Sequence, residues 1–126
     1  MKSFIISVVI GISIIVGSIT FGMYIENMSE EMLDYSGEIK SEIESGDFEI
    51  ADKKIDELSE FIEEKKIVLA STMNHEKLDK IEETIAELGA YSKSRQWHDA
   101  LARCEALAFQ LEHLPRDYML KAENIL

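Results

Sequence analysis

The hydrophobic pattern divides the chain into one unbroken apolar run and a series of striped segments. Residues 4–25, FIISVVIGISIIVGSITFGMYI, hold 22 positions without a charge. A helix of that length spans about 33 Å, which matches a bilayer hydrocarbon core of roughly 30 Å. Half of these positions are Ile or Val, which favour strands in water, but a single segment in lipid must satisfy its own backbone hydrogen bonds. The sequence therefore predicts a helical transmembrane anchor over residues 1–25.

A cleaved signal peptide is the alternative interpretation of this run. The apolar region of a signal peptide covers only about 7 to 15 residues and ends at a small-x-small cleavage site. The run here is longer, and Thr20-Phe21-Gly22 fits that site poorly. Lys2 is the lone charge before the span, whereas Glu26 follows it, so positive charge favours a cytoplasmic N-terminus. We predict a single-pass protein of the cytoplasmic membrane whose remainder lies on the extracytoplasmic side.

The rest of the chain carries apolar residues at helical spacing. Breaks at residues 45–47, 71–74 and 92–96 divide it into four stripes, and Pro115 ends the last one. Asn74 is a candidate N-cap. No proline or clear cap separates the anchor from the first stripe, so one helix can carry both. The stripes are Met28, Met32, Tyr35, Ile39 and Ile43; Phe48, Ala51, Ile55, Leu58, Ile62 and Leu69; Leu78, Ile81, Ile85 and Leu88; and Trp97, Ala100, Leu101, Cys104, Leu107, Ala108 and Leu111.

The second and fourth stripes repeat each other. Shifted by 49 positions, SGDFEIADKKIDEL lies on SRQWHDALARCEAL and pairs Phe48 with Trp97 and Ala51 with Ala100. A turn, an aromatic and then a small residue resembles tetratricopeptide-type repeats, where these residues set how closely two helices pack, although 49 exceeds their period of about 34. We therefore expect longer helices in an up-and-down bundle, with Phe48 and Trp97 as equivalent packing anchors.

These patterns predict an all-α fold. An N-terminal transmembrane helix, residues 1–25, precedes an acidic bundle, residues 26–126. Two hairpins similar to tetratricopeptide units, residues 27–70 and 74–114, form the bundle, and residues 115–126 add a short C-terminal helix.

Charge is unevenly distributed along the bundle. The formal net charge of the chain is −12, and residues 26–64 carry 15 acidic against 3 basic side chains, whereas residues 65–126 carry 10 against 9. Such a surface repels nucleic-acid phosphates and anionic lipid head groups, so nucleic acid is not an expected partner. A solvated helical face is one interpretation, and a surface for a cation or a basic partner is the other. Because the acidic half follows the anchor directly in sequence, we place it, with the turn at residues 45–47, near the membrane.

Two groups of residues are candidates for contact with other proteins. Small residues on one side of the anchor permit close approach of a second transmembrane helix, which suggests a membrane-protein partner beside the lipid bilayer itself. A second small-residue set lies on the opposite side, so the stripe can also reflect composition alone. Phe61 and Tyr91 fall off their stripes and are interface candidates if exposed. The anchor stripe consists of Ser7, Gly11, Ser18 and Gly22.

The sequence offers little for catalysis. It contains no glycine-rich phosphate loop and no nucleophile elbow. His75, Asp79 and His113 are the weak candidates for a transition-metal site, but His75-Glu76 lacks the second histidine of a zinc-protease motif. Cys104 lies within the fourth stripe and is expected to be a buried structural residue, unable to form an intrachain disulfide. We therefore expect neither an enzyme nor a resident cofactor.

The C-terminal half resembles a known family. The segments NHEKLDKIEETIAEL, QLEHLP and AENIL are similar to the bacterial family called domain of unknown function 4363, small proteins with one N-terminal membrane span. The resemblance implies a Gram-positive, spore-forming source and a multi-span membrane protein as partner, and it implies no activity. Its most specific parts are Asn74-His75-Glu76, Leu111-Glu112-His113-Leu114 and Asn124-Ile125-Leu126.

Two functions from different classes fit these features. The first is a membrane-anchored, non-enzymatic interaction or scaffold module that presents an acidic helical bundle to another envelope membrane protein. The alternative is a helical bundle that senses a small ligand or metal ion as an accessory to a membrane protein.

Overall fold

A computed structural model describes residues 1–72 and 74–114 of the chain. The described residues form five α-helices and no strand, which confirms the all-α prediction. The expected C-terminal helix at residues 115–126 lies outside the described residues. The helices are α1 (Lys2–Glu44), α2 (Phe48–Glu64), α3 (Lys66–Thr72), α4 (His75–Lys93) and α5 (Trp97–Glu112).

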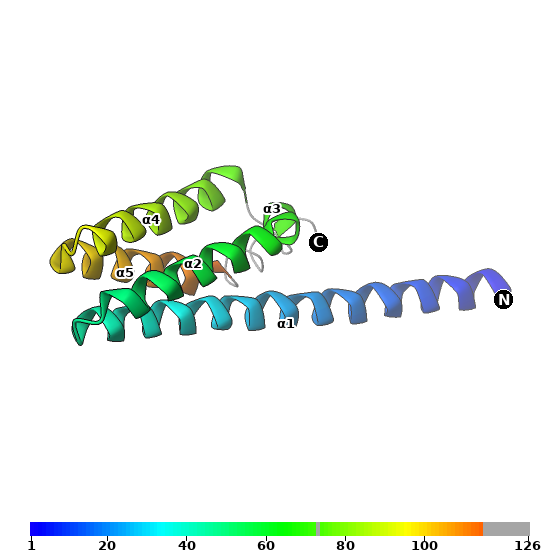
Figure 1. The fold of residues 1–126 in the computed structure, drawn as a ribbon. Helices are drawn as coiled ribbons and strands as arrows, with labels where there is room; N and C mark the ends of the chain where they lie inside the picture. The colour runs from blue at the N-terminus through cyan, green and yellow to red at the C-terminus, as the bar shows by residue number, and fades with distance from the viewer. Residues whose placement is uncertain (73, 115–126) are drawn as a thin grey trace.

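The anchor and the first bundle helix are one continuous helix, α1 (Figure 1). The part of α1 before Phe21 extends beyond the bundle and contacts no other helix, so its apolar side chains are exposed. Burial begins at Ile25, which is 2% exposed, and continues at helical spacing to Ile43. Within the described residues α1 is the one helix long and apolar enough to cross a membrane. The apolar segment therefore leads into the bundle without a linker.

Helices α1, α2, α4 and α5 form a closed four-helix bundle. Each contacts two neighbours, in the order α1, α2, α4, α5 and back to α1, and successive helices run in opposite directions (Figure 1). This is the predicted up-and-down arrangement, which requires only short connections. The core consists of one buried apolar cluster: Ile25, Met28, Met32, Ile39, Ile43, Ala51, Ile55, Leu58, Ile62, Leu69, Leu78, Ile81, Ile85, Leu88, Ala100, Cys104, Leu107, Leu111 and Leu114.

The two hairpin turns have the same backbone conformation. Gly46 and Arg95, which are 49 positions apart, both adopt a positive φ, of 83° and 62°. In the first turn the amides of Gly46 and Asp47 donate to the carbonyls of Ile43 and Glu42. In the second, the amides of Arg95 and Gln96 donate to the carbonyls of Ser92 and Tyr91, again 49 positions further on. Each turn is thus a Schellman motif that closes the helix before it.

Packing repeats with the same period. Ile39 and Leu88, at matching positions of the two hairpins, are both fully buried, and so are the pairs that follow them along the second helix of each hairpin. An ion pair is repeated as well, because Lys54 contacts Glu38 at 2.9 Å and Arg103 contacts Glu87 at 3.2 Å. The hairpins are therefore related by an approximate two-fold axis along the bundle. The other buried pairs are Ala51 with Ala100, Ile55 with Cys104, Leu58 with Leu107 and Ile62 with Leu111.

The second stripe does not lie on a single helix, contrary to the sequence analysis. Helix α2 ends at Glu64, and Lys65 separates it from the seven-residue α3, which crosses the end of the bundle nearest the anchor (Figure 1). Leu69 is buried at 2% exposure from α3 rather than from an extended α2. Periodicity missed the bend because Ile62 and Leu69, seven residues apart, share a face on any straight helix.

Two expected breaks are shorter than the sequence analysis proposed. Helix α3 extends to Thr72, so the loop expected at residues 71–74 begins later. Helix α4 extends to Lys93, so the break expected at residues 92–96 is the turn at residues 94–96. Asn74 is the N-cap of α4, and its side chain accepts a hydrogen bond from the amide of Lys77 at 2.9 Å.

The turn at residues 45–47 is far from the membrane anchor. Both turns lie side by side at the end of the bundle opposite to α3, where α1 ends (Figure 1). The expectation that this turn lies near the apolar segment of α1 is therefore wrong. The distance along the sequence from the anchor is short, but the intervening helix is straight, and 20 residues of helix from Ile25 to Glu44 separate the turn from the span by about 30 Å.

Two buried serines bring α1 against α5. The hydroxyl of Ser29 donates to the carbonyl oxygen of Leu111 at 2.7 Å, and that of Ser36 lies 3.5 Å from the carbonyl oxygen of Cys104. Both serines are at most 3% exposed. Small side chains that donate to a neighbouring backbone allow close helix approach without leaving a buried hydroxyl unsatisfied. The contact between α1 and α5 thus closes the bundle.

A pair of glycine substitutions tests the turn conformation. An added methyl group meets no atom within 4 Å at Gly46 or at Gly37, so only the backbone differs between them. Gly46→Ala should lower the free energy of unfolding by roughly 1 to 2 kcal/mol because φ is positive there. Gly37→Ala, within α1, should raise it by about 0.5 to 1 kcal/mol. Urea unfolding of the full chain in detergent measures both, and equal effects at the two sites would contradict the assignment.

Candidate interaction surfaces

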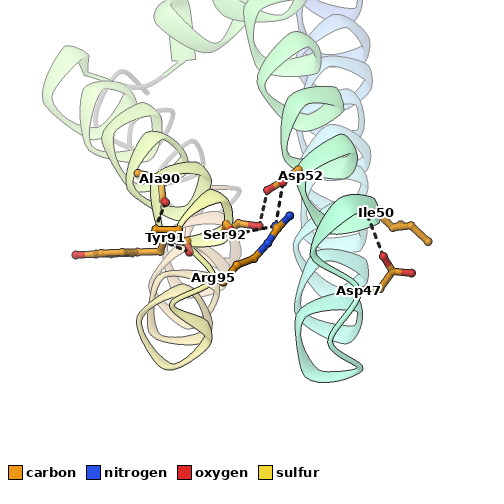
Figure 2. A network of polar contacts seen from close by, with 8 residues as sticks. Asp47, Ile50, Asp52, Ala90, Tyr91, Ser92 and Arg95 are labelled. Atoms are coloured by element: carbon orange, nitrogen blue, oxygen red, sulfur yellow. Dashed lines mark hydrogen bonds and ion pairs between the residues drawn. The ribbon is translucent and has the colours of Figure 1, made fainter.

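The end of the bundle far from the anchor carries a polar cluster that joins the two hairpins (Figure 2). The Arg95 guanidinium lies 3.2 Å from a carboxylate oxygen of Asp52 on α2 and 3.1 Å from the carbonyl oxygen of Ser92. It also lies over the ring of Phe48, 5.1 Å from its centroid. These contacts occupy the side chain of a residue with positive φ, where glycine would be less strained. The second turn therefore keeps an arginine that bridges to the first hairpin.

Ser92 extends the same cluster into the core. It is fully buried, and its hydroxyl donates to the other carboxylate oxygen of Asp52 at 2.6 Å. The positions equivalent to Ser92 and Asp52 in the other copy hold Ile43 and Leu101, which are both apolar. The contact of Asp52 with Ser92 between the two hairpins is thus polar, whereas the equivalent positions are apolar. The mismatch between Ile43 and Ser92 was the signal in the sequence that could have located this cluster.

The aromatic positions of the repeat differ in burial. Ala51 and Ala100 are both fully buried. Phe48 packs against the core, but Trp97 is 46% exposed and stacks on the ring of His98 with centroids 3.8 Å apart. The expectation that Trp97 is a packing anchor equivalent to Phe48 is therefore wrong. On the first turn of α5 the indole lies at the rim of the bundle.

Phe61 and Tyr91, expected to be exposed if they are interface residues, are partly buried and pack against the core. The ring of Phe61 lies 5.9 Å from that of Tyr35 on α1. Both residues therefore contribute to helix packing. The large apolar side chains that are exposed in the described part of the bundle are Ile50, Ile67, Trp97 and Phe109.

Most of the small-residue stripe, namely Ser7, Gly11 and Ser18, lies on the part of α1 that projects from the bundle (Figure 1), whereas Gly22 is partly buried. Ser7 donates a hydrogen bond to the carbonyl oxygen of Ser3 at 2.9 Å, so its hydroxyl is satisfied within the helix. A methyl group added at Gly11 would meet nothing within 4 Å. Ser18 and Gly22 continue the stripe toward the bundle. The structure contains no second helix against this stripe in the described residues.

The candidate metal ligands are not assembled into a site. His75 and Asp79 are exposed on the first two turns of α4. His113 follows the end of α5, where its Nδ1 lies 2.9 Å from the carbonyl oxygen of Phe109 and its ring contacts the Phe109 ring. Within residues 1–72 and 74–114, no three His, Cys, Asp or Glu side chains are close enough to hold a metal ion.

Cys104 is 1% exposed in the centre of α5. Burial raises the pKa of its thiol from an ordinary value of 9.0 to about 12, and Lys40 only partly opposes this effect. The thiolate, which is the reactive form, is therefore scarce in the folded protein. Cys104 acts as a small apolar core residue at the position that Ile55 occupies in the other hairpin.

The exposed acidic residues are concentrated on two neighbouring helices of the bundle. Helices α1 and α2 are neighbours, and together they contain most of the acid of the chain. Lys54 of α2 pairs with Glu38 of α1, whereas Lys40 of α1 pairs with Glu105 of α5, and these carboxylates raise the pKa of both lysines. We name the exposed side of α1 and α2 the acidic face. Its exposed acidic residues are Glu26, Glu30, Glu31, Asp34, Glu38, Glu44, Glu49, Asp56, Glu57, Glu60, Glu63 and Glu64.

Substitutions at Asp52 and Ser92 test whether the polar cluster replaces an apolar contact. Asp52→Leu alone leaves the buried Ser92 hydroxyl without its acceptor and should cost about 1 to 3 kcal/mol of unfolding free energy. Asp52→Leu with Ser92→Ile copies the apolar residues at the equivalent positions of the repeat, Leu101 and Ile43. The double variant should therefore lose less stability than the two single variants added together, by about 1 kcal/mol or more. Simple additivity in urea unfolding would contradict this interpretation.

Alkylation of Cys104 tests its burial. A pKa of about 12 in place of 9.0 reduces the thiolate fraction at pH 8 on the order of 1,000-fold, so the folded protein should resist iodoacetamide. A cysteine introduced at the exposed Ala102 of the same helix should react at an ordinary rate. Equal alkylation of Cys104 and the cysteine at position 102 would refute the burial of Cys104.

The same pKa shift has a consequence for stability. Because the pKa of Cys104 is higher in the folded than in the unfolded protein, ionisation of the thiol favours unfolding. The contribution of Cys104 to the free energy of unfolding is therefore complete below pH 9 and is lost as the pH rises from 9.0 through about 12. Cys104→Ala should reduce the pH dependence of unfolding in that range.

Comparison with known protein families places most of the chain in one family. A family model, described as domain of unknown function (DUF4363), matches residues 19–125, which include the last turns of the span and the entire described bundle. No curated protein and no solved structure matches the chain. The match supports the resemblance expected from the sequence, and the protein belongs to the DUF4363 family.

Proposed function

We propose that the protein is a membrane-anchored, non-enzymatic interaction module. The span fixes it in the cytoplasmic membrane, and the bundle presents its acidic face on the extracytoplasmic side to another envelope membrane protein. The partner offers a basic surface above the bilayer and a transmembrane helix within it.

The continuity of α1 is the observation that carries this proposal. One helix from Lys2 to Glu44 contains both the exposed apolar segment and a full side of the bundle. A flexible linker would let the bundle rotate freely relative to the membrane. A continuous helix instead fixes which side of the bundle faces a neighbour of the span, and it holds the turns about 30 Å from the bilayer.

The charge distribution supports a basic partner. The acidic face belongs to α1, the helix that enters the membrane, and to its neighbour α2. Complementary charge across an interface accelerates association and selects the orientation of the partner. Anionic lipid head groups repel the same face, which keeps it available to a protein.

The interior of the bundle supports binding rather than catalysis. Its buried polar side chains are hydroxyls of Ser29, Ser36, Thr84 and Ser92, and each donates to an acceptor within the protein. The buried thiol of Cys104 has a raised pKa. A catalytic site would require titratable groups that converge in a cavity.

Photo-crosslinking in native membranes tests the proposal. A photoreactive amino acid at Glu57, on the acidic face, should produce a discrete adduct with a membrane protein. Glu60→Lys with Glu64→Lys should weaken the adduct because both charges lie on the same exposed side of α2. Added salt should weaken it too, since exposed charges are screened.

A matched position on α5 provides the control. Ala102 is exposed on the helix diagonal to α2, so the same reagent there should give little adduct. Replacing residues 4–25 with a leucine-rich helix should reduce the yield from Glu57 if the small-residue stripe contacts the span of the partner. If neither the native chain nor the span variant captures a protein, the proposed function is wrong.

A further inference from the structure

Helix α3 exposes an apolar side chain at the end of the bundle nearest the anchor. Ile67 is 86% exposed, which is more than any other large apolar side chain in the described part of the bundle. Its neighbours do not share this exposure, because Leu69 is buried and Val68 and Ala70 are partly buried against the core. The core thus holds α3 in place by one side, and Ile67 projects from the other.

The anchor fixes the height of α3 relative to a membrane. The side-chain nitrogen of Lys65, the residue before α3, lies 5.8 Å from the centre of the Tyr24 ring on α1. Tyr24 is near the end of the uncharged run, and its ring stacks with that of Phe21 at 6.4 Å. Aromatic residues at the end of a span lie at the membrane interface. With residues 4–25 in the bilayer, α3 therefore lies at the level of the lipid head groups.

The charges around Ile67 fit this position. Lys65 and Lys66 precede it, and long basic side chains reach the head-group layer while the chain beside them enters the bilayer. Lys66 also lies 3.6 Å from Glu82 and 4.0 Å from Glu63. Local charge is therefore nearly balanced, so the apolar side chain is the main attraction to the bilayer.

We propose that α3 is a second membrane contact, in which Ile67 enters the boundary between head groups and acyl chains of the leaflet from which α1 emerges. This inference rests on the proposed span. A lone transmembrane helix is free to tilt and to rotate about its axis. A second contact beside it restrains both motions, and so directs the acidic face of α1 and α2 to a constant side.

Fluorescence quenching in lipid vesicles tests the contact. The full chain with Cys104→Ala receives a single cysteine at Ile67, Ile50 or Ile14, each labelled with an environment-sensitive dye. Ile50 is exposed on the first turns of α2, far from the anchor, and Ile14 is exposed within the span. The vesicles contain phosphatidylcholine with one-fifth phosphatidylglycerol and spin-labelled lipids whose quenching groups lie at shallow or deep positions.

The three positions should give different results. The label at Ile67 should shift its emission to shorter wavelength and lose intensity with the shallow quencher, whereas the label at Ile50 should do neither. The label at Ile14 should respond to the deep quencher. Unchanged emission from Trp97, the single tryptophan of the chain, reports that the fold is retained in all three variants.

The failures of the two proposals are distinguishable. If the label at Ile14 is not quenched, the proposed span itself is wrong. If Ile14 is quenched while Ile67 behaves as Ile50 does, α3 does not contact lipid and this inference alone is overturned. An emission shift of the label at Ile67 in native membranes but not in pure lipid vesicles would also overturn it, because a protein partner would then cover α3.

Discussion

The structure depends on one helix, α1, whose two halves have different surroundings. The first half of α1 exposes apolar side chains on all sides, and the second half buries apolar residues on one side only, from Ile25 to Ile43. Helices α2 and α5 cover the apolar side of the second half, whereas no helix of the described residues covers the first half. The bundle begins where the apolar run ends, so the position and direction of every other helix follow from α1.

Around this helix the fold is built from two similar hairpins. Their turns share positive φ values at Gly46 and Arg95, and their helices share the ion pairs Lys54–Glu38 and Arg103–Glu87. Similar hairpins related by a two-fold axis bury the same side of each helix, which explains why one apolar pattern serves both. The two hairpins differ where a buried hydroxyl in one replaces an apolar side chain in the other.

The differences have physical causes. On α1, Ser29 and Ser36 donate to carbonyls of α5, whereas the equivalent residues of α4 are the apolar Leu78 and Ile85. The same substitution of hydroxyl for hydrocarbon occurs at Ser92, whose partner Asp52 also binds Arg95. Buried hydroxyls require specific acceptors, so these contacts define how the two hairpins meet. Apolar pairs alone would tolerate more than one alignment.

The end of the bundle from which the apolar segment projects differs from the end that holds the two turns. Helix α3 crosses the end from which the segment projects, and the positions 49 residues further along the chain, 115–121, lie outside the described residues. Lys65 ends α2 and lies near Tyr24, so the chain turns across the end of the bundle beside the anchor.

The sequence by itself determined the helical class, a first helix long and apolar enough to cross a membrane, the equivalence of the hairpins and the N-cap at Asn74, because each follows from spacing or composition along the chain. It also determined most of the core, since buried positions recur at helical spacing. Tertiary structure decided where the chain bends after Glu64, which end of the bundle holds the turns, and that Trp97 is half exposed. It also assembled Asp52, Ser92 and Arg95 from two hairpins. These features depend on which helices meet in space, and periodicity along one helix carries no information about its neighbours.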